Sequence, residues 1–143
     1  MIILDTNVLA ELTRRTPHRG VVSWLDSLST GEVATTAVTA AELWYGLSRL
    51  PEGRRRRELS EAVSAMLDHD LRDRVEPFDA GAAAHYADIV AERERRGRPI
   101  GLADAQIAAI CRARRARLAT RNGPDVTDVG VELIDPWGFT PEG

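Results

Sequence analysis

The chain has 143 residues, of which 43% are hydrophobic and 29% charged, with a formal net charge of −3 at pH 7. This size and composition predict a soluble protein in which residues 1–143 form a single domain around one core. No apolar stretch approaches the roughly 20 residues of a membrane helix, and no basic leader precedes an apolar run, so we expect a cytoplasmic protein without membrane contacts. The acidic balance argues against binding nucleic acid by general electrostatics.

Strand-like and helix-like segments alternate along the chain. We expect strands at 2–4, 33–36, 74–78, 118–120 and 131–134, and helices at 7–15, 18–28, 39–50, 54–69, 80–96 and 103–115. Short apolar or β-branched runs indicate the strands, and apolar residues at helical spacing indicate the helices. Because strands separated by helices pair in parallel, the order predicts an α/β fold with a central parallel sheet and helices on both faces.

The basic residues are all arginine, 19 in number, and the chain has no lysine. Arginine clusters at 54–57, 93–98 and 112–117 are interpreted as solvated helix faces, although the planar guanidinium also suits phosphate. The lack of lysine excludes P-loop phosphate binding and Schiff-base chemistry. The single cysteine, Cys111, cannot form an internal disulfide, and its apolar helical setting predicts a buried, inert thiol.

Four acidic residues lie where a strand or a loop gives way to a helix or a turn: Asp5, Glu42, Asp104 and Asp125. Asp5 follows an apolar strand directly, and ligands of open parallel sheets bind at the carboxyl ends of the strands. Each residue also has a structural explanation. Asp5 can be a helix N-cap, Glu42 can close a capping box that begins at Thr39, and Asp104 suits a first helical turn.

Taken together, the four carboxylates predict a cation site, because the topology would bring several strand and helix ends to one edge of the sheet. Two carboxylates about 4 Å apart repel by roughly 4 kcal/mol at an effective dielectric constant near 20. Mg²⁺ prefers oxygen ligands, bridges to phosphate oxygens and can activate water. His18, His69 and His85 show no paired ligand spacing, so a transition-metal site competes poorly.

Four motifs in chain order resemble those of PIN-domain nucleases. They are IILDTNVL at 2–9, TAAEL at 39–43 with YGL at 45–47, GLADAQIAA at 101–109, and ATRN at 119–122. Their order, spacing and near-complete coverage of the chain are similar to the VapC-type toxins of toxin–antitoxin pairs. The ending VELIDPW at 131–137 resembles the FitB-like branch of that family.

The resemblance implies a three-layer α/β/α PIN fold and an endoribonuclease that depends on Mg²⁺ or Mn²⁺ and cleaves RNA. It also implies a small antitoxin partner that inhibits the enzyme and usually binds DNA, so that this chain would reach DNA only through the antitoxin. Asp5 and Asp104 would ligate the metal, and Glu42 would ligate it or orient the attacking water.

The resemblance also implies supporting residues and leaves the fourth acidic position open. Thr6, Asn7 and Thr120 would support the site by hydrogen bonds. Asn122 occupies a position where some PIN domains have Asp, and Asp125 follows three residues later. Either residue can fill the fourth position, because the Gly-Pro turn between them could displace Asp125.

The amphipathic helices expected at 54–69 and 80–96 carry more apolar residues than one thin core readily absorbs. We therefore expect part of this surface to form a twofold homodimer interface, with an antitoxin segment in the neighbouring groove. The apolar residues in question are Leu59, Val63, Met66, Leu67, Tyr86, Ile89 and Val90.

Three alternatives share parts of this pattern. A haloacid-dehalogenase-like phosphatase expects a second Asp where this chain has Asn7, and it usually requires a lysine. A phosphorylation receiver domain has a similar size and an acidic pocket, but it too depends on a lysine. A catalytically silent PIN-fold module that binds protein or DNA differs only in activity, which an assay must decide.

Overall fold

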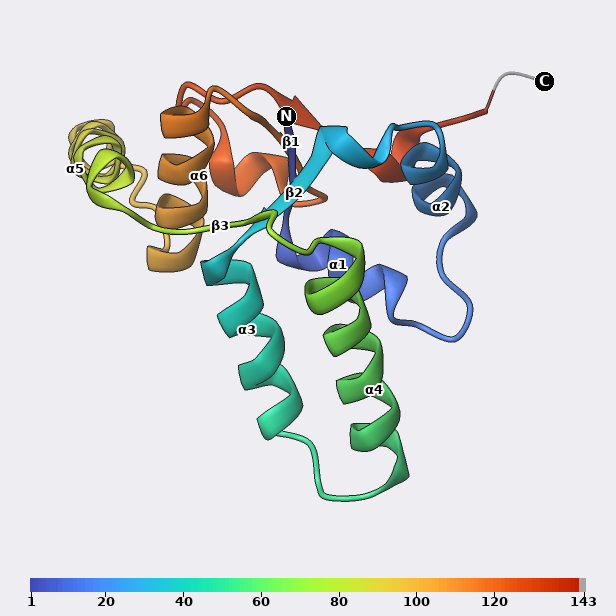
Figure 1. Ribbon diagram of the computed structural model, residues 1–143. Helices are drawn as coiled ribbons and strands as arrows, with labels where there is room; N and C mark the ends of the chain where they lie inside the picture. The colour runs from blue at the N-terminus through green and yellow to red at the C-terminus, as the bar shows by residue number, and fades with distance from the viewer. Residues whose placement is uncertain (142–143) are drawn as a thin grey trace.

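The computed structural model describes residues 1–141 and arranges them as a parallel sheet between two helical layers (Figure 1). The strands are β1 (Ile2–Leu4), β2 (Val33–Thr36), β3 (Val75–Glu76), β4 (Arg117–Ala119) and β5 (Leu133–Ile134). Their order is β3-β2-β1-β4-β5, and every neighbouring pair is parallel. The predicted α/β/α fold class is therefore confirmed, while residues 142 and 143 of the predicted span lie outside the described part.

The six predicted helices are present. They are α1 (Thr6–Leu12), α2 (Arg19–Asp26), α3 (Ala37–Ser48), α4 (Arg54–Ala65), α5 (Ala80–Arg95) and α6 (Leu102–Arg114). Shorter elements are the 3-10 helices η1 (Thr30–Glu32), η3 (Gly123–Val126) and η4 (Pro136–Gly138), and the π-helical turn η2 (Met66–Asp70) that extends α4. No helix within residues 1–141 has both the length and the apolar character needed to cross a membrane.

Two helix boundaries differ from the prediction for local reasons. α1 ends at Leu12 rather than at residue 15, because the hydroxyl and the N–H of Thr13 both bond back to the carbonyl oxygen of Ala10. α3 begins two residues earlier than predicted, because the side chain of Thr36 accepts a hydrogen bond from the N–H of Thr39 at 3.0 Å and caps the helix. Thr36 thus ends β2 and starts α3.

The central strand β1 divides the hydrophobic interior into two cores. Alternate side chains of a strand point to opposite faces. Ile2 and Leu4 pack with α1, α2, α3 and α4, whereas Ile3 packs with α5 and α6. Each of these side chains is at most 2% exposed, so its burial contributes about 1.5–3 kcal/mol. The residue after β1, Asp5, is consequently held in a fixed position.

The two cores absorb most of the apolar residues that we expected to form a dimer interface. Val63, Leu67 and Ile89 are 3%, 8% and 2% exposed in a single chain, and Leu59, Met66 and Tyr86 pack against the cores. Val90 belongs to neither core, and the homodimer stays a prediction. The large apolar side chains that stay exposed are Met1, Trp44, Tyr45 and Leu102.

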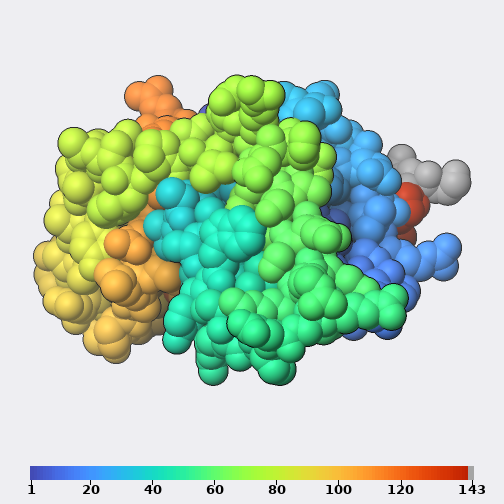
Figure 2. All heavy atoms as spheres, turned by 60° about the horizontal axis from the view of Figure 1, so that its bottom comes forward, coloured from blue at the N-terminus to red at the C-terminus, as the bar shows by residue number. Residues whose placement is uncertain are grey.

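Because all the strands are parallel, their carboxyl ends share one edge of the sheet, at the bottom in Figure 1. α3 and α4 project past this edge as a pair of antiparallel helices. In Figure 2, which brings this side forward, α3 and α4 (teal and green) fill the middle of the face and α6 (orange) lies between α3 and α5. The edge is thus bordered by α1, α3 and α6, which carry Thr6, Glu42 and Asp104.

Candidate active site

Asp5 is the buried centre of the polar residues at this edge, with a relative exposure of 5%. Its Oδ1 accepts a hydrogen bond from the backbone N–H of Thr6 at 2.8 Å, so it does cap α1. Its Oδ2 accepts one from the hydroxyl of Thr120 at 2.7 Å, across the gap between β1 and β4. Asp5 therefore has a structural role and is also fixed by a residue that the sequence analysis assigned to the site.

Asn7 links the start of α1 to the segment after β4. Its Nδ2 donates to the hydroxyl oxygen of Thr120 at 3.2 Å and to Oδ2 of Asp5 at 3.4 Å. Its Oδ1 accepts from the backbone N–H of Arg121 at 3.1 Å, and Thr120 Oγ1 accepts from the backbone N–H of Asn122 at 3.0 Å. The first residues after β1 and β4 are thus joined by one network of neutral donors.

Glu42 lies on α3 and reaches the same edge. Its Oε1 accepts a hydrogen bond from the hydroxyl of Thr6 at 2.6 Å, and the Thr39 hydroxyl lies 3.2 Å from that of Thr6. The capping box predicted for Thr39 and Glu42 is wrong, because α3 starts earlier and is capped by Thr36. The Glu42 carboxylate therefore faces another helix rather than its own N-terminus.

Asp104 lies in the first turn of α6, as predicted. Burial raises the pKa of its carboxyl group, and the negative charges of Asp5, Asp125 and Glu42 raise it further, while the positive charge of Arg93 acts in the opposite direction. These effects depend on proximity, so the four predicted acidic residues share one region. Burial of Asp104 and its repulsion by the other three carboxylates therefore act in the same direction.

The fourth acidic position involves η3 and the residue before it. Asn122 precedes η3 and is tied to Thr120 by its backbone, and the N–H of Asp125 donates to the carbonyl oxygen of Asn122 at 3.0 Å. Pro124 lies at the start of this helix, where its missing N–H costs nothing. The charge of Asp125 acts on Asp104, so the Gly-Pro turn does not remove Asp125 from the region.

The donor set fits a hard divalent cation, since it consists of carboxylate and neutral oxygens with unbalanced negative charge around Asp104. Within residues 1–141, no group of three or more His, Cys, Asp or Glu side chains has the arrangement to hold a metal ion. Mg²⁺ does not require one, because it commonly takes one or two carboxylates and retains several waters. Burial and the charge of Asp5 raise the pKa of the Cys111 thiol to about 12, so no thiolate contributes.

One residue near the site differs from its predicted setting, and another was not predicted. Arg93 was interpreted as part of a solvated arginine face, but its side chain is only 5% exposed. It follows Ile89 by four residues and Ala82 by eleven, and this helical spacing places it on the buried face of α5. Thr39 was missed as a buried hydroxyl beside Thr6. The helical period could have identified Arg93.

Comparisons with known proteins find relatives that match nearly the whole chain. The PIN domain family matches residues 2–130. The chain is 38% identical over 137 residues to VapC ribonuclease Y4jK of Sinorhizobium fredii, covering 96% of this chain and 98% of that protein. It is 36% identical over 137 residues to Toxin FitB of Neisseria gonorrhoeae, covering 96% and 99%. The solved structure of FitAB bound to an IR36 DNA fragment has a TM-score of 0.90 at 34% identity and covers 100% of both chains.

Proposed function

The chain belongs to the PIN-domain family, and from this premise we propose that it is an endoribonuclease toxin neutralised by a cognate antitoxin. A VapC ribonuclease and the toxin FitB align with nearly its whole length and support this function. The observation that carries the proposal is the grouping of carboxylates at the edge where parallel sheets bind ligands, with Asp5 held by Thr120 and Glu42 held by Thr6. Burial, and then the charges of these two residues and of Asp125, raise the pKa of Asp104 in the same region.

We infer that Asp5 and Asp104 hold a Mg²⁺ or Mn²⁺ ion and that Glu42 ligates it or orients the attacking water. When bound, such a cation supplies an activated water and stabilises negative charge on the phosphodiester. The protein holds the carboxylates in place with neutral donors: Thr120 donates to Asp5 at 2.7 Å and Thr6 to Glu42 at 2.6 Å. These bonds orient the carboxylates without neutralising their charge.

The proposal extends to partners and assembly. RNA is the substrate, and contact with DNA is indirect through the antitoxin, in line with the similarity to FitAB in its DNA-bound structure. Residues 1–143 act as a single nuclease domain in the cytoplasm, and the active form is a homodimer. Light scattering of the chain, alone and with the product of the neighbouring gene, tests the assembly. A strict monomer in both samples at tens of micromolar would contradict it.

Cleavage of RNA by the purified, antitoxin-free chain across a Mg²⁺ titration tests the function. Glu42→Gln should remain folded, because a Gln side chain can still accept the hydrogen bond from Thr6. It should lose about 10² to 10⁴ in rate if Glu42 takes a proton from water, and more if Glu42 ligates the metal. Glu61→Gln, which removes the same charge at an exposed position of α4, is the matched control and should cleave normally.

Two results would contradict the proposal. If the Gln variant at position 42 cleaves at the wild-type rate at every Mg²⁺ concentration, the assignment of Glu42 is wrong. If the wild-type chain cleaves no RNA with Mg²⁺ or Mn²⁺, the chain is a silent PIN-fold binding module. Addition of a chelator to an active sample must abolish cleavage, since a metal-independent activity would point to a contaminating nuclease.

A further inference from the structure

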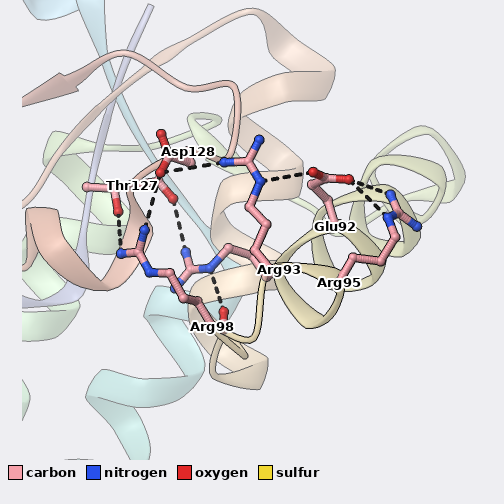
Figure 3. Close-up of polar contacts among 7 residues, drawn as sticks. Glu92, Arg93, Arg95, Arg98, Thr127 and Asp128 are labelled. Carbon is pink, nitrogen blue, oxygen red and sulfur yellow. Dashed lines mark hydrogen bonds and ion pairs between the residues drawn. The ribbon is translucent and has the colours of Figure 1, made fainter.

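Arg93, near the end of α5, is a buried cation outside the acidic site. Its side chain is 5% exposed, whereas arginines such as Arg54, Arg95 and Arg98 form ion pairs on the surface. The adjacent carboxylate of Glu92 does not serve it, because Glu92 pairs with Arg95 and Arg96 on the surface (Figure 3). A buried charge is costly unless hydrogen bonds satisfy it, so the contacts of Arg93 require an explanation.

The guanidinium of Arg93 donates to backbone carbonyl oxygens of two separate segments. Nε donates to Arg98 at 2.7 Å, in the loop that leads into α6. Nη1 donates at 3.0 Å to Thr127, just after η3 (Figure 3). It also donates at 3.4 Å to Asp125, within η3. One planar group therefore connects the loop that precedes Asp104 to the segment that carries Asp125.

Exposed contacts reinforce the same junction. Arg98 donates to Oδ2 of Asp128 at 3.3 Å and to the hydroxyl of Thr127 at 3.1 Å, and Arg96 lies 3.7 Å from Asp128 (Figure 3). The Arg96, Arg98 and Asp128 side chains are about half exposed, so solvent and salt weaken these pairs. The buried bonds of Arg93, made by a charged donor in a low-dielectric setting, are the stronger link.

We propose that Arg93 is a positioning residue, whose guanidinium holds the loop before Asp104 and the segment of Asp125 at a fixed separation and so sets the metal affinity of the site. This inference rests on the proposed function for the roles of Asp104 and Asp125. It assigns Arg93 no contact with substrate. Its side chain acts only through the backbone of the two segments. The second segment is also tied at its start, where the N–H of Asn122 donates to Thr120.

The proposal predicts a result with the opposite sign to simple electrostatics. Removal of a positive charge near an acidic cluster should by itself strengthen binding of a cation. Loss of a positioning contact should weaken it, and residues that orient metal ligands typically contribute 10- to 100-fold in affinity. A purely structural role would lower stability and leave the affinity of the folded protein unchanged. Mn²⁺ binding to Arg93→Met therefore separates the three explanations.

The experiment measures Mn²⁺ binding by calorimetry and amide hydrogen exchange of the metal-free full chain. Arg93→Met should bind Mn²⁺ about tenfold more weakly, and segments 96–104 and 122–129 should exchange about tenfold faster. Arg95→Met removes an exposed arginine two positions away and should match wild type in both measurements. Val21→Ala creates a cavity in the core between the sheet and α1–α4, away from α5 and α6, and so lowers stability without touching Arg93. It should leave the Mn²⁺ affinity unchanged.

Arg93→Lys keeps the positive charge but replaces the planar guanidinium with a single ammonium group. That group cannot reproduce the hydrogen bonds that Nε and Nη1 of Arg93 make to two separate segments. Arg93→Lys should therefore also weaken Mn²⁺ binding, and it serves as the test if the Met variant does not fold. The proposal would be overturned if the Arg93→Lys protein had the Mn²⁺ affinity and the amide exchange rates of wild type. It would also be overturned if the Arg93→Met protein bound Mn²⁺ as tightly as wild type or more tightly. If wild type binds no Mn²⁺ and cleaves no RNA, the proposed function fails, while faster exchange at both segments still supports the positioning contact.

Discussion

Replacing Asp104 by Asn is the most direct test of repulsion within the acidic site. Burial and the charges of Asp5, Asp125 and Glu42 raise the pKa of Asp104, so its ionised form is less favourable in the folded protein than in the unfolded chain. Asn has nearly the same size and no charge. The metal-free Asp104→Asn protein should therefore be more stable than wild type at neutral pH, unlike most substitutions at a polar site.

The size of the effect follows from Coulomb interactions reduced by solvent. Two unit charges about 6 Å apart at an effective dielectric constant of 20 interact by about 3 kcal/mol. Asp104 is only partly buried, and screening reduces such terms strongly. We expect a net gain of about 1 kcal/mol, which corresponds to an increase of roughly 3 °C in Tm for a chain of this length.

The sign of the pH dependence provides a second test. An acidic group whose pKa is raised on folding stabilises the folded state fully below its unfolded pKa, and that contribution is lost as the pH rises through its folded pKa. Wild type and Asp104→Asn should therefore have similar stability where Asp104 is protonated in both states. They should diverge as the pH rises past the ordinary carboxyl pKa of 3.8, with wild type the less stable.

Urea unfolding at several pH values, with and without Mg²⁺, measures both effects. At ten times its Kd, Mg²⁺ should stabilise wild type by about 1.4 kcal/mol and the Asn variant much less. Asp88→Asn, at an exposed position of α5, is the control and should change little in either condition. The reasoning is refuted if the metal-free Asn variant is no more stable than wild type near pH 8 and Mg²⁺ stabilises both equally.

Two further substitutions test the surroundings of the site. Thr120→Val keeps the shape of the side chain but removes the hydroxyl that donates to Asp5 at 2.7 Å. It should lower the free energy of unfolding by about 1–3 kcal/mol and the rate of RNA cleavage by more than tenfold. A folded Val variant with wild-type cleavage would contradict this. Burial raises the pKa of Glu11, but the backbone N–H of His18 and the side chain of Arg14 lower it more, so its net pKa lies below 4.5. The contribution of Glu11 to stability is present above its unfolded pKa and is lost as the pH falls through its folded pKa. Glu11→Gln should therefore destabilise the protein at pH 7 and have little effect in strong acid. An equal loss of stability at both pH values would refute the assignment.

The fold was predictable from sequence where local patterns and tertiary structure agree. β1 and β2 have the predicted bounds, because short apolar and β-branched runs have no competing local structure. The start of α3 was not predictable from the capping-box pattern at Thr39, since Thr36 is both the last strand residue and the N-cap. Pattern alone does not decide between two potential caps three residues apart.

Asp5 and Asp104 have a local signal in the sequence, because Asp5 directly follows a strand and Asp104 lies in the first turn of a helix. Glu42 lacks such a signal, since it lies within α3. The contacts that join the site residues have none either. Thr6 and Glu42 are 36 residues apart, and Asn7 and Thr120 are 113 apart, so only the sheet topology brings each pair together. For Arg93 two local signals disagree. Its charge predicted an exposed side chain, whereas its helical spacing predicted the buried side chain that the structure shows. Spacing was the better guide there.

The distribution of arginines explains why the acidic site retains its charge. Within residues 1–141, seven arginine side chains form ion pairs, and none of them pairs with Asp5, Glu42, Asp104 or Asp125. The paired carboxylates are Glu11, Glu58, Glu76, Asp79, Glu92 and Asp128. Hydroxyl and amide donors orient the site carboxylates instead, and these donors carry no compensating charge. Within the described residues, a chain with 19 arginines thus forms no ion pair with the four site carboxylates, although the charge of Arg93 acts on Asp104 from a distance. A bound cation would relieve the repulsion that remains. A divalent metal and a basic side chain from a partner would meet that same need, so they should compete for the site.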